Sequence, residues 1–261
     1  IGAIERWDGQ RGAGPSNAWQ SMQRCIELAK EKGMGIVALQ NTNHWMRGGT
    51  YGWQAAESGC IAICFTNTMP NMPPWGGKTA TTGNNPLIIA VPHQDAHVVI
   101  DMSLSQFSYG KLHEHKLKGK LLPLPGGYDE DGQLTTDPEA IIQTRRILQT
   151  GYWKGSGLSL MLDLLATLIS GGHATADIAN FPAETGLSQI FLCRDCQKLN
   201  GDEHDAIVEK VLQFYCSAEP EDTDHAVKYP GQSTYLRRQS SLELGITVDE
   251  KIWNDILALV K

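Results

Sequence analysis

The amino-acid sequence predicts an α/β protein in which helices cover a mixed, non-Rossmann sheet. Two observations lead to this fold class. Short apolar runs alternate with amphipathic stretches in the first half of the chain, whereas helical periodicity dominates the second half. No G-x-G-x-x-G follows any of the apolar runs, so the usual support for a Rossmann nucleotide site is missing. We expect residues 1–261 to form one catalytic and cofactor-binding unit with interleaved lobes.

The first half of the chain is expected to supply most of the sheet. An extended segment at residues 1–8 comes first, and a helix over residues 16–32 follows, with Ser16 as its N-cap and Gly33 as its stop. The other elements expected there are a strand at 35–41, a helix at 51–57 and strands at 61–67, 86–91 and 98–102. Apolar runs of this length are typical of buried strands.

The second half is expected to supply most of the covering helices. The elements expected there are helices at 104–117, 138–147, 155–170, 205–216 and 248–260 and a strand at 187–192. Residues 118–137 are rich in Gly, Pro and Asp and should form a surface loop. Within it, residues 129–132 (Asp-Glu-Asp-Gly) lack the rest of a calcium-binding loop, so they predict a solvated turn.

Composition excludes several function classes. A formal net charge of −7 leaves no basic surface for nucleic acid. The most apolar stretch, residues 155–172, carries a polar stripe and is expected to be a buried helix, since a membrane span needs ~20 mainly apolar residues. The six cysteines, including the C-x-x-C pair Cys193 and Cys196 in an expected strand, predict reduced structural thiols and a cytoplasmic location.

His44 is the most suggestive single residue for chemistry. It follows the strand at 35–41, in a loop with Arg47 and two glycines, and open α/β sheets bind ligands beyond the carboxyl ends of their strands. A histidine there can transfer a proton near neutral pH, and Arg47 can pair with a substrate carboxylate. The alternative is a histidine that bonds to backbone in a surface turn.

Two other positions suggest a bound anion or ribose. Lys154 stands at the start of a helix, where its ammonium and free N–H groups can hold an anion, although an ordinary capped helix is the alternative. Asp101 ends a strand, where its carboxylate can accept from ribose hydroxyls or cap the next helix. Residues 72–78 and 83–86 have the Pro- and Gly-rich character of ligand-lining loops.

Together these stretches resemble the malate/L-lactate dehydrogenase family, whose members do not use a Rossmann fold. The resemblance runs along the whole chain and is carried by Asn43-His44, by residues 83–86 and 101–103, and by Lys154-Gly155. The strings HWMRGGTYGWQAAE, MPPWGGK and GYWKGSGLS are closest to family members that reduce a diketo sugar acid.

The resemblance implies an NAD(P)H-dependent reductase of a small 2-oxo or diketo acid, with NAD(H) or NADP(H) as cofactor and no metal. It also implies a homodimer with the cofactor near the interface. His44 matches a histidine credited with proton transfer in some members, and Arg47 is expected to bind substrate. The implied cofactor-binding residues are His97, Val98, Val99, Ile100, Asp101, Met102 and Ser103, then Trp153 and Lys154, then a late loop of Gly231, Gln232 and Ser233.

The sequence departs from the family pattern at three places. The family's N-terminal helical region, with its Ser-His-Gly motif, would precede Ile1; Asn84 stands where Thr is usual, and Gln232 where close relatives carry His. Alternatives within the same fold are a malate, lactate or ureidoglycolate dehydrogenase and a cyclic imine reductase. An alternative from another class is a binding protein without catalysis.

Overall fold

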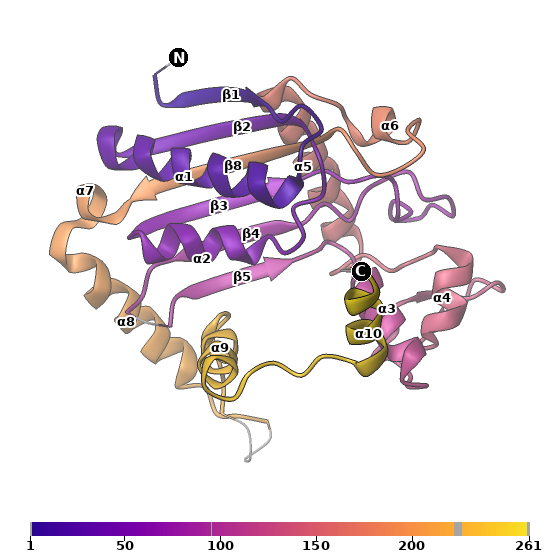
Figure 1. The fold of residues 1–261 in the computed structure, drawn as a ribbon. Helices are drawn as coiled ribbons and strands as arrows, with labels where there is room; N and C mark the ends of the chain where they lie inside the picture. The colour runs from indigo at the N-terminus through magenta and orange to yellow at the C-terminus, as the bar shows by residue number, and fades with distance from the viewer. Residues whose placement is uncertain (1, 95, 222–225, 260–261) are drawn as a thin grey trace.

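A six-stranded sheet forms the centre of the molecule (Figure 1). The computed structural model describes residues 2–94, 96–221 and 226–259. Across the sheet the strands are β1 (Ile4–Asp8), β2 (Met34–Thr42), β8 (Leu187–Asp195), β3 (Cys60–Thr66), β4 (Leu87–Val91) and β5 (Val98–Met102). The β1–β2 pair is parallel and the other neighbouring pairs are antiparallel, so the predicted mixed sheet is confirmed.

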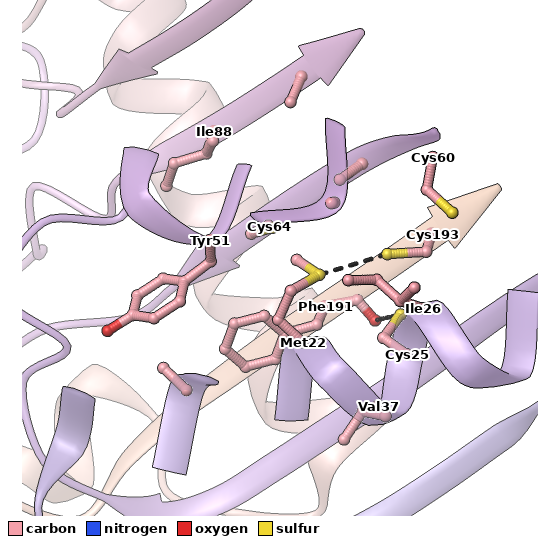
Figure 2. Close-up of a cluster of buried hydrophobic side chains, with 14 of the residues drawn as sticks. Met22, Cys25, Ile26, Val37, Tyr51, Cys60, Cys64, Ile88, Phe191 and Cys193 are labelled. Atoms are coloured by element: carbon pink, nitrogen blue, oxygen red, sulfur yellow. Dashed lines mark hydrogen bonds between the residues drawn. The ribbon is translucent and has the colours of Figure 1, made fainter. Parts of the chain in front are cut away.

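Helices α1 (Gly14–Lys32) and α2 (Gly49–Glu57) cover one face of the sheet (Figure 1). Between them and the strands lies a closed apolar cluster that includes Met22, Trp45 and Phe191, each no more than 1% exposed. Figure 2 shows part of this cluster, in which the Cys193 thiol donates to Met22 Sδ at 3.3 Å. We call this cluster the sulfur-rich core.

Helix α5 (Trp153–Ser170) covers the other face of the sheet (Figure 1). Its inner side buries Leu162 and Ala166 against residues from the strands. Its outer side leaves apolar side chains exposed, namely Leu160, Met161, Leu164 and Leu168, which are 57%, 50%, 45% and 69% exposed. Across the described residues, no helix combines the length and apolar character needed to cross a membrane.

A small lobe beside the sheet holds α3 (Tyr109–Leu117) and α4 (Pro138–Thr144) around a third apolar cluster. The helix expected from residue 104 begins only at Tyr109, because Ser108 caps it and the preceding backbone pairs with residues 148–150 instead. The expected loop at 118–137 contains a hairpin of β6 (Gly127–Tyr128) and β7 (Leu134–Thr135), with the predicted turn at its tip.

The other helix boundaries also correct the sequence predictions. Ser16 is not the N-cap of α1, because Pro15 fits the first turn and the helix already begins at Gly14. The helix predicted over 138–147 ends at Thr144, where Arg145 adopts a left-handed conformation. Cys196 does not belong to a strand but begins α7 (Cys196–Asn200).

The remaining elements follow α5 in the chain, on either side of β8. They are α6 (Thr175–Ile178), a 3-10 helix (Gly201–Glu203), α8 (His204–Cys216), α9 (Gln232–Leu244) and α10 (Glu250–Leu259). Gly231 and the two residues after it are therefore not a loop, as expected, but the cap and first turn of α9. Helix α9 reaches the edge of the sheet because Val99 N–H donates to the Pro230 carbonyl at 2.9 Å.

Candidate functional site

One end of the sheet brings together loops that are far apart in the sequence. The carboxyl ends of β2, β3 and β5 and the amino end of β4 share this end, as the strand pairing requires. A cavity of about 530 Å³ opens there, and we call it the histidine cavity. Its polar lining comprises His44, Arg47, Thr68, Asn71, Asn84, Asp101, Ser103, Ser108, Tyr109 and Glu184. Ligand sites beyond strand ends are usual in open α/β sheets.

His44 lies on the wall of this cavity with its imidazole exposed. The Met46 backbone N–H donates to His44 Nδ1 at 3.0 Å. Because a backbone N–H can only donate, Nδ1 must accept, so neutral His44 carries its proton on Nε2. Met46 adopts a positive φ of 67° to deliver this bond. The alternative interpretation, a histidine that bonds to backbone in a turn, is therefore correct for Nδ1. The proton of the neutral ring is on Nε2.

The residues on either side of His44 are firmly held. Trp45 is 1% exposed, and its ring lies 6.0 Å from Phe191 in the sulfur-rich core. Asn43 accepts from Thr185 Oγ1 at 2.7 Å through its side chain and from Gln189 Nε2 at 3.1 Å through its carbonyl. The loop that carries His44 is thus anchored to the apolar core and to the start of β8.

A hydrogen-bonded cluster in the lining of the same cavity was not predicted from the sequence. Asn84 Oδ1 accepts from Asn71 Nδ2 at 2.9 Å and from Thr68 Oγ1 at 3.3 Å, and the Tyr109 hydroxyl donates to the Asn71 carbonyl at 2.9 Å. Burial raises the pKa of Tyr109, which keeps this phenol protonated as a donor. Only Asn84 lay in a stretch that the sequence analysis singled out. Thr68 and Asn71 could have been noticed as polar residues that follow a buried strand.

Asp101 lines the histidine cavity and also a second, neighbouring cavity. Its carboxylate accepts from the Gly49 backbone N–H at 2.8 Å and lies 3.8 Å from Arg47 Nε. It therefore stabilises the amino end of α2 rather than the helix expected after residue 104. Gly49 is required at this contact, because a Cβ there would lie 2.7 Å from Asp101 Oδ2. Arg47 remains 64% exposed and can reach a ligand.

Two further cavities continue from this junction. The first, which we call the bridging cavity, measures about 370 Å³ and is lined by Arg47, Gly49, Trp53, Val99, Ile100, Asp101, Pro230 and Thr234. The second, which we call the arginine cavity, measures about 460 Å³ and is lined by Trp19, Arg47, Thr50, Trp53, Gln54, Glu57, Thr234, Arg237, Arg238 and Ser241. Arg47 lines all three cavities. The bridging cavity also shares Asp101 with the histidine cavity and Trp53 and Thr234 with the arginine cavity, so it lies between the other two and the three form one row.

The implied cofactor residues fall into three groups in space. Val99, Ile100, Asp101 and Ser103 line the histidine or the bridging cavity. His97, Val98, Met102, Gly231, Gln232 and Ser233 lie next to that lining without belonging to it, with Gly231 packed against the β5 backbone. Trp153 and Lys154 form the exposed first turn of α5 and line none of the three cavities.

Comparisons with known proteins show what the chain as a whole is similar to. Residues 1–257 match the family model described as malate/L-lactate dehydrogenase. The chain is 48% identical over 261 residues to a 2,3-diketo-L-gulonate reductase from Citrobacter koseri, an alignment that covers 99% of this chain and 78% of that relative.

Two solved structures support the fold. A sulfolactate dehydrogenase from Methanocaldococcus jannaschii superposes with a TM-score of 0.83 at 29% identity, covering 95% of this chain and 73% of that one. A delta1-piperideine-2-carboxylate reductase from Pseudomonas syringae pvar. tomato gives a TM-score of 0.84 at 25% identity, covering 99% of this chain and 78% of that one. The likeness therefore extends over nearly the whole chain.

Proposed function

Because this chain belongs to the malate/L-lactate dehydrogenase family and is therefore an oxidoreductase, we propose that it reduces a carbonyl group of a small 2-oxo or diketo sugar acid. The name of the 48% identical relative supports a substrate like 2,3-diketo-L-gulonate. The observation that carries the proposal is His44, whose Nδ1 is occupied by the Met46 N–H and whose other nitrogen bears a proton beside a cavity of about 530 Å³.

The family implies a nicotinamide cofactor, and the row of cavities fits one. A dinucleotide is a long, charged ligand, and the bridging and arginine cavities offer it a continuous surface along α2. Gln54 in the wall of the arginine cavity is 6% exposed and carries a buried Oε1 without a hydrogen-bond partner. When bound, the reduced nicotinamide supplies the hydride for the carbonyl carbon.

His44 and Arg47 then have distinct roles. The Nε2–H of neutral His44 donates a hydrogen bond to the carbonyl oxygen and stabilises the negative charge that develops there, and the resulting alkoxide takes its proton from solvent. Arg47 binds the substrate carboxylate, for which its exposed guanidinium can exchange its long 3.8 Å contact with Asp101. The Asn71, Asn84 and Tyr109 wall faces the rest of the substrate and can bond its hydroxyl groups. Trp153 and Lys154 retain their proposed role in cofactor binding as a separate hypothesis.

An absorbance assay of reduced nicotinamide tests this proposal. Purified protein receives NADH or NADPH with 2,3-diketo-L-gulonate, pyruvate, oxaloacetate or delta1-piperideine-2-carboxylate in turn. We expect the highest kcat/KM with the diketo sugar acid. A higher value with another acid would mean that this acid is the preferred substrate, while the proposed reductase activity would stand. Absence of turnover with every acid, while cofactor still binds, would favour the binding protein without catalysis.

We also propose that the protein is a cytoplasmic homodimer. The exposed apolar side chains on the outer side of α5 support a second copy as the covering partner. All six cysteines are free thiols, which a reducing compartment preserves. Light scattering after size-exclusion chromatography should give twice the chain mass of 28.6 kDa, and Leu168→Lys should shift the protein toward one chain mass.

A further inference from the structure

The arginine cavity carries more positive than negative charge. Arg47, Arg237 and Arg238 line it together with a single carboxylate, that of Glu57. Arg238 pairs with Glu57 at 2.6 Å and lies 6.0 Å from the centre of the Trp53 ring. Arg237 forms no hydrogen bond or ion pair with any residue in the described ranges. One guanidinium is therefore free to bind an anion, and guanidinium groups favour phosphate.

The same cavity contains features that suit a purine base. Trp19 is 51% exposed and offers an aromatic surface on which a base can stack. Gln54 donates through Nε2 to the Trp19 carbonyl at 3.2 Å, while its buried Oε1 lacks a partner. A small rotation of the Gln54 amide would allow this oxygen to accept from an exocyclic amine of the base. An aromatic surface, a hydrogen-bond acceptor and a free guanidinium together describe a site for an adenosine phosphate.

The order of the cavities fixes which part of the cofactor lies where. The reacting ring must lie near His44, so the histidine cavity takes substrate and nicotinamide. The bridging cavity contains Thr234, which lies in the first turn of α9, a 13-residue helix whose amino end suits the pyrophosphate. The arginine cavity comes last in the row and receives the adenosine end. Its phosphate partner is then the 2′-phosphate that distinguishes NADPH from NADH.

We propose that the arginine cavity binds the 2′-phosphoadenosine end of NADPH and that Arg237 makes the chain prefer NADPH over NADH. This inference rests on the proposed reductase function. A carboxylate facing the 2′ position of the ribose would repel a 2′-phosphate. The Asp101 carboxylate instead accepts from the Gly49 backbone N–H and lies near Arg47 in the bridging cavity, so it does not oppose the preference for NADPH. The sequence alone left this choice open because the orientation of the Asp101 carboxylate could not be predicted from it.

Calorimetry with fragments of the cofactor tests the site without requiring turnover. The full chain is titrated with adenosine 2′,5′-bisphosphate and with adenosine 5′-monophosphate. We expect the bisphosphate to bind roughly 10- to 100-fold more tightly, the range for one charge-assisted contact. Arg237→Gln should abolish that difference, whereas Trp19→Ala should weaken both nucleotides. Lys251→Gln, an equal charge change on exposed α10, should alter neither.

Steady-state kinetics tests the preference itself. Arg237→Gln should lower kcat/KM for NADPH by roughly 10- to 100-fold and leave that for NADH nearly unchanged. Equal losses with both cofactors, or a wild-type preference for NADH, would overturn the proposal. If the chain shows no turnover but binds the bisphosphate in an Arg237-dependent way, the nucleotide site stands and the proposed reaction fails.

Discussion

Two consecutive residues, His44 and Trp45, belong to opposite kinds of environment. Trp45 is buried in the sulfur-rich core, where its ring lies 5.7 Å from that of Tyr51 and 6.0 Å from that of Phe191. His44 is exposed on the histidine cavity, and its imidazole accepts from the backbone N–H of Met46, two residues further on. The close packing of one side chain therefore fixes the position of the other. A reactive group can stay exposed and still be well oriented when its neighbour is held by the core.

The two regions also differ in how they treat ionisable groups. In the sulfur-rich core, burial raises the pKa of Cys60 to about 11 and that of Cys64 well above its usual value. At the open end, polar residues from several separate segments line the cavities, and the side chains of Arg47, Arg237 and Arg238 are exposed. Substitutions should accordingly change stability in the first region and catalysis in the second.

Replacing His44 should produce the largest effect on activity. His44→Ala removes the Nε2–H that donates to the carbonyl oxygen, so kcat with the diketo sugar acid should fall by about 10²- to 10³-fold. Its free energy of unfolding should hardly change, because the imidazole is exposed. Cofactor affinity, measured by quenching of protein fluorescence, should also be kept. His113→Ala, an exposed histidine on α3, is the matched control, and a normal rate in His44→Ala would remove this residue from the mechanism.

Replacing Phe191 should have the largest effect on stability. Phe191→Ala leaves a cavity beside Trp45 and Tyr51, so the free energy of unfolding should fall by about 3–5 kcal/mol. Phe214→Ala, which removes a ring that is 83% exposed, should cost much less. Urea denaturation followed by tryptophan fluorescence measures both. Equal losses in the two variants would mean that the sulfur-rich core does not stabilise the fold as its packing indicates.

Replacing Asp195, the last residue of β8, should have a smaller effect on the free energy of unfolding, and this effect should depend on pH. Burial raises the pKa of this carboxyl, but the Lys30 ammonium at 3.1 Å and the Lys198 backbone N–H outweigh it and hold the pKa below its usual value. The resulting stabilisation is complete above the unfolded pKa of about 3.9 and is lost as pH falls through the folded pKa. Asp195→Asn should therefore be less stable than wild type by about 1–2 kcal/mol at pH 7.

The same measurement at lower pH checks the sign of this linkage. The difference between Asp195→Asn and wild type should shrink as the pH is lowered through the acid range, because the wild-type carboxylate then becomes protonated. Parallel stability curves for the two proteins from pH 7 to acid would contradict the role given to the Lys30 pair.

The sheet could be predicted from the sequence because its strands are short apolar runs bounded by turn residues. The residues around His44 were found for the same reason, since they follow such a run directly. Helix α9 was not predicted, because it buries none of its residues and shows only a weak apolar face. The start of α3 was misplaced because Leu104 and Phe107 have the spacing of one helix face. The backbone of this segment instead bonds to residues 148–150.

The candidate site was predictable only where chemistry and sequence motif coincide. Thr68, Asn71 and Tyr109 come from three separate segments, and their common cavity exists only after the strands have paired. Arg237 and Gln54 are likewise 183 positions apart in the chain and lie on different helices. Neither stands in a recognisable motif. Pairing of distant segments is a tertiary property that local periodicity cannot predict.

The smallest expected effect concerns the cysteines and tests how closed the sulfur-rich core is. Burial raises the pKa of Cys60, Cys64 and Cys196, and the neighbouring Cys25 thiol together with burial raises that of Cys193, so all four stay protonated. Cys216 is the one cysteine that is not buried. Iodoacetamide at pH 8 should therefore label the native protein at Cys216 alone and all six thiols after unfolding, as mass spectrometry would measure. Labelling at Cys216 should leave turnover unchanged, because this residue lines none of the three cavities. Rapid labelling of Cys25 or Cys193 would instead show that the core opens on the time scale of the experiment, and that it could not hold Trp45, and hence His44, in place.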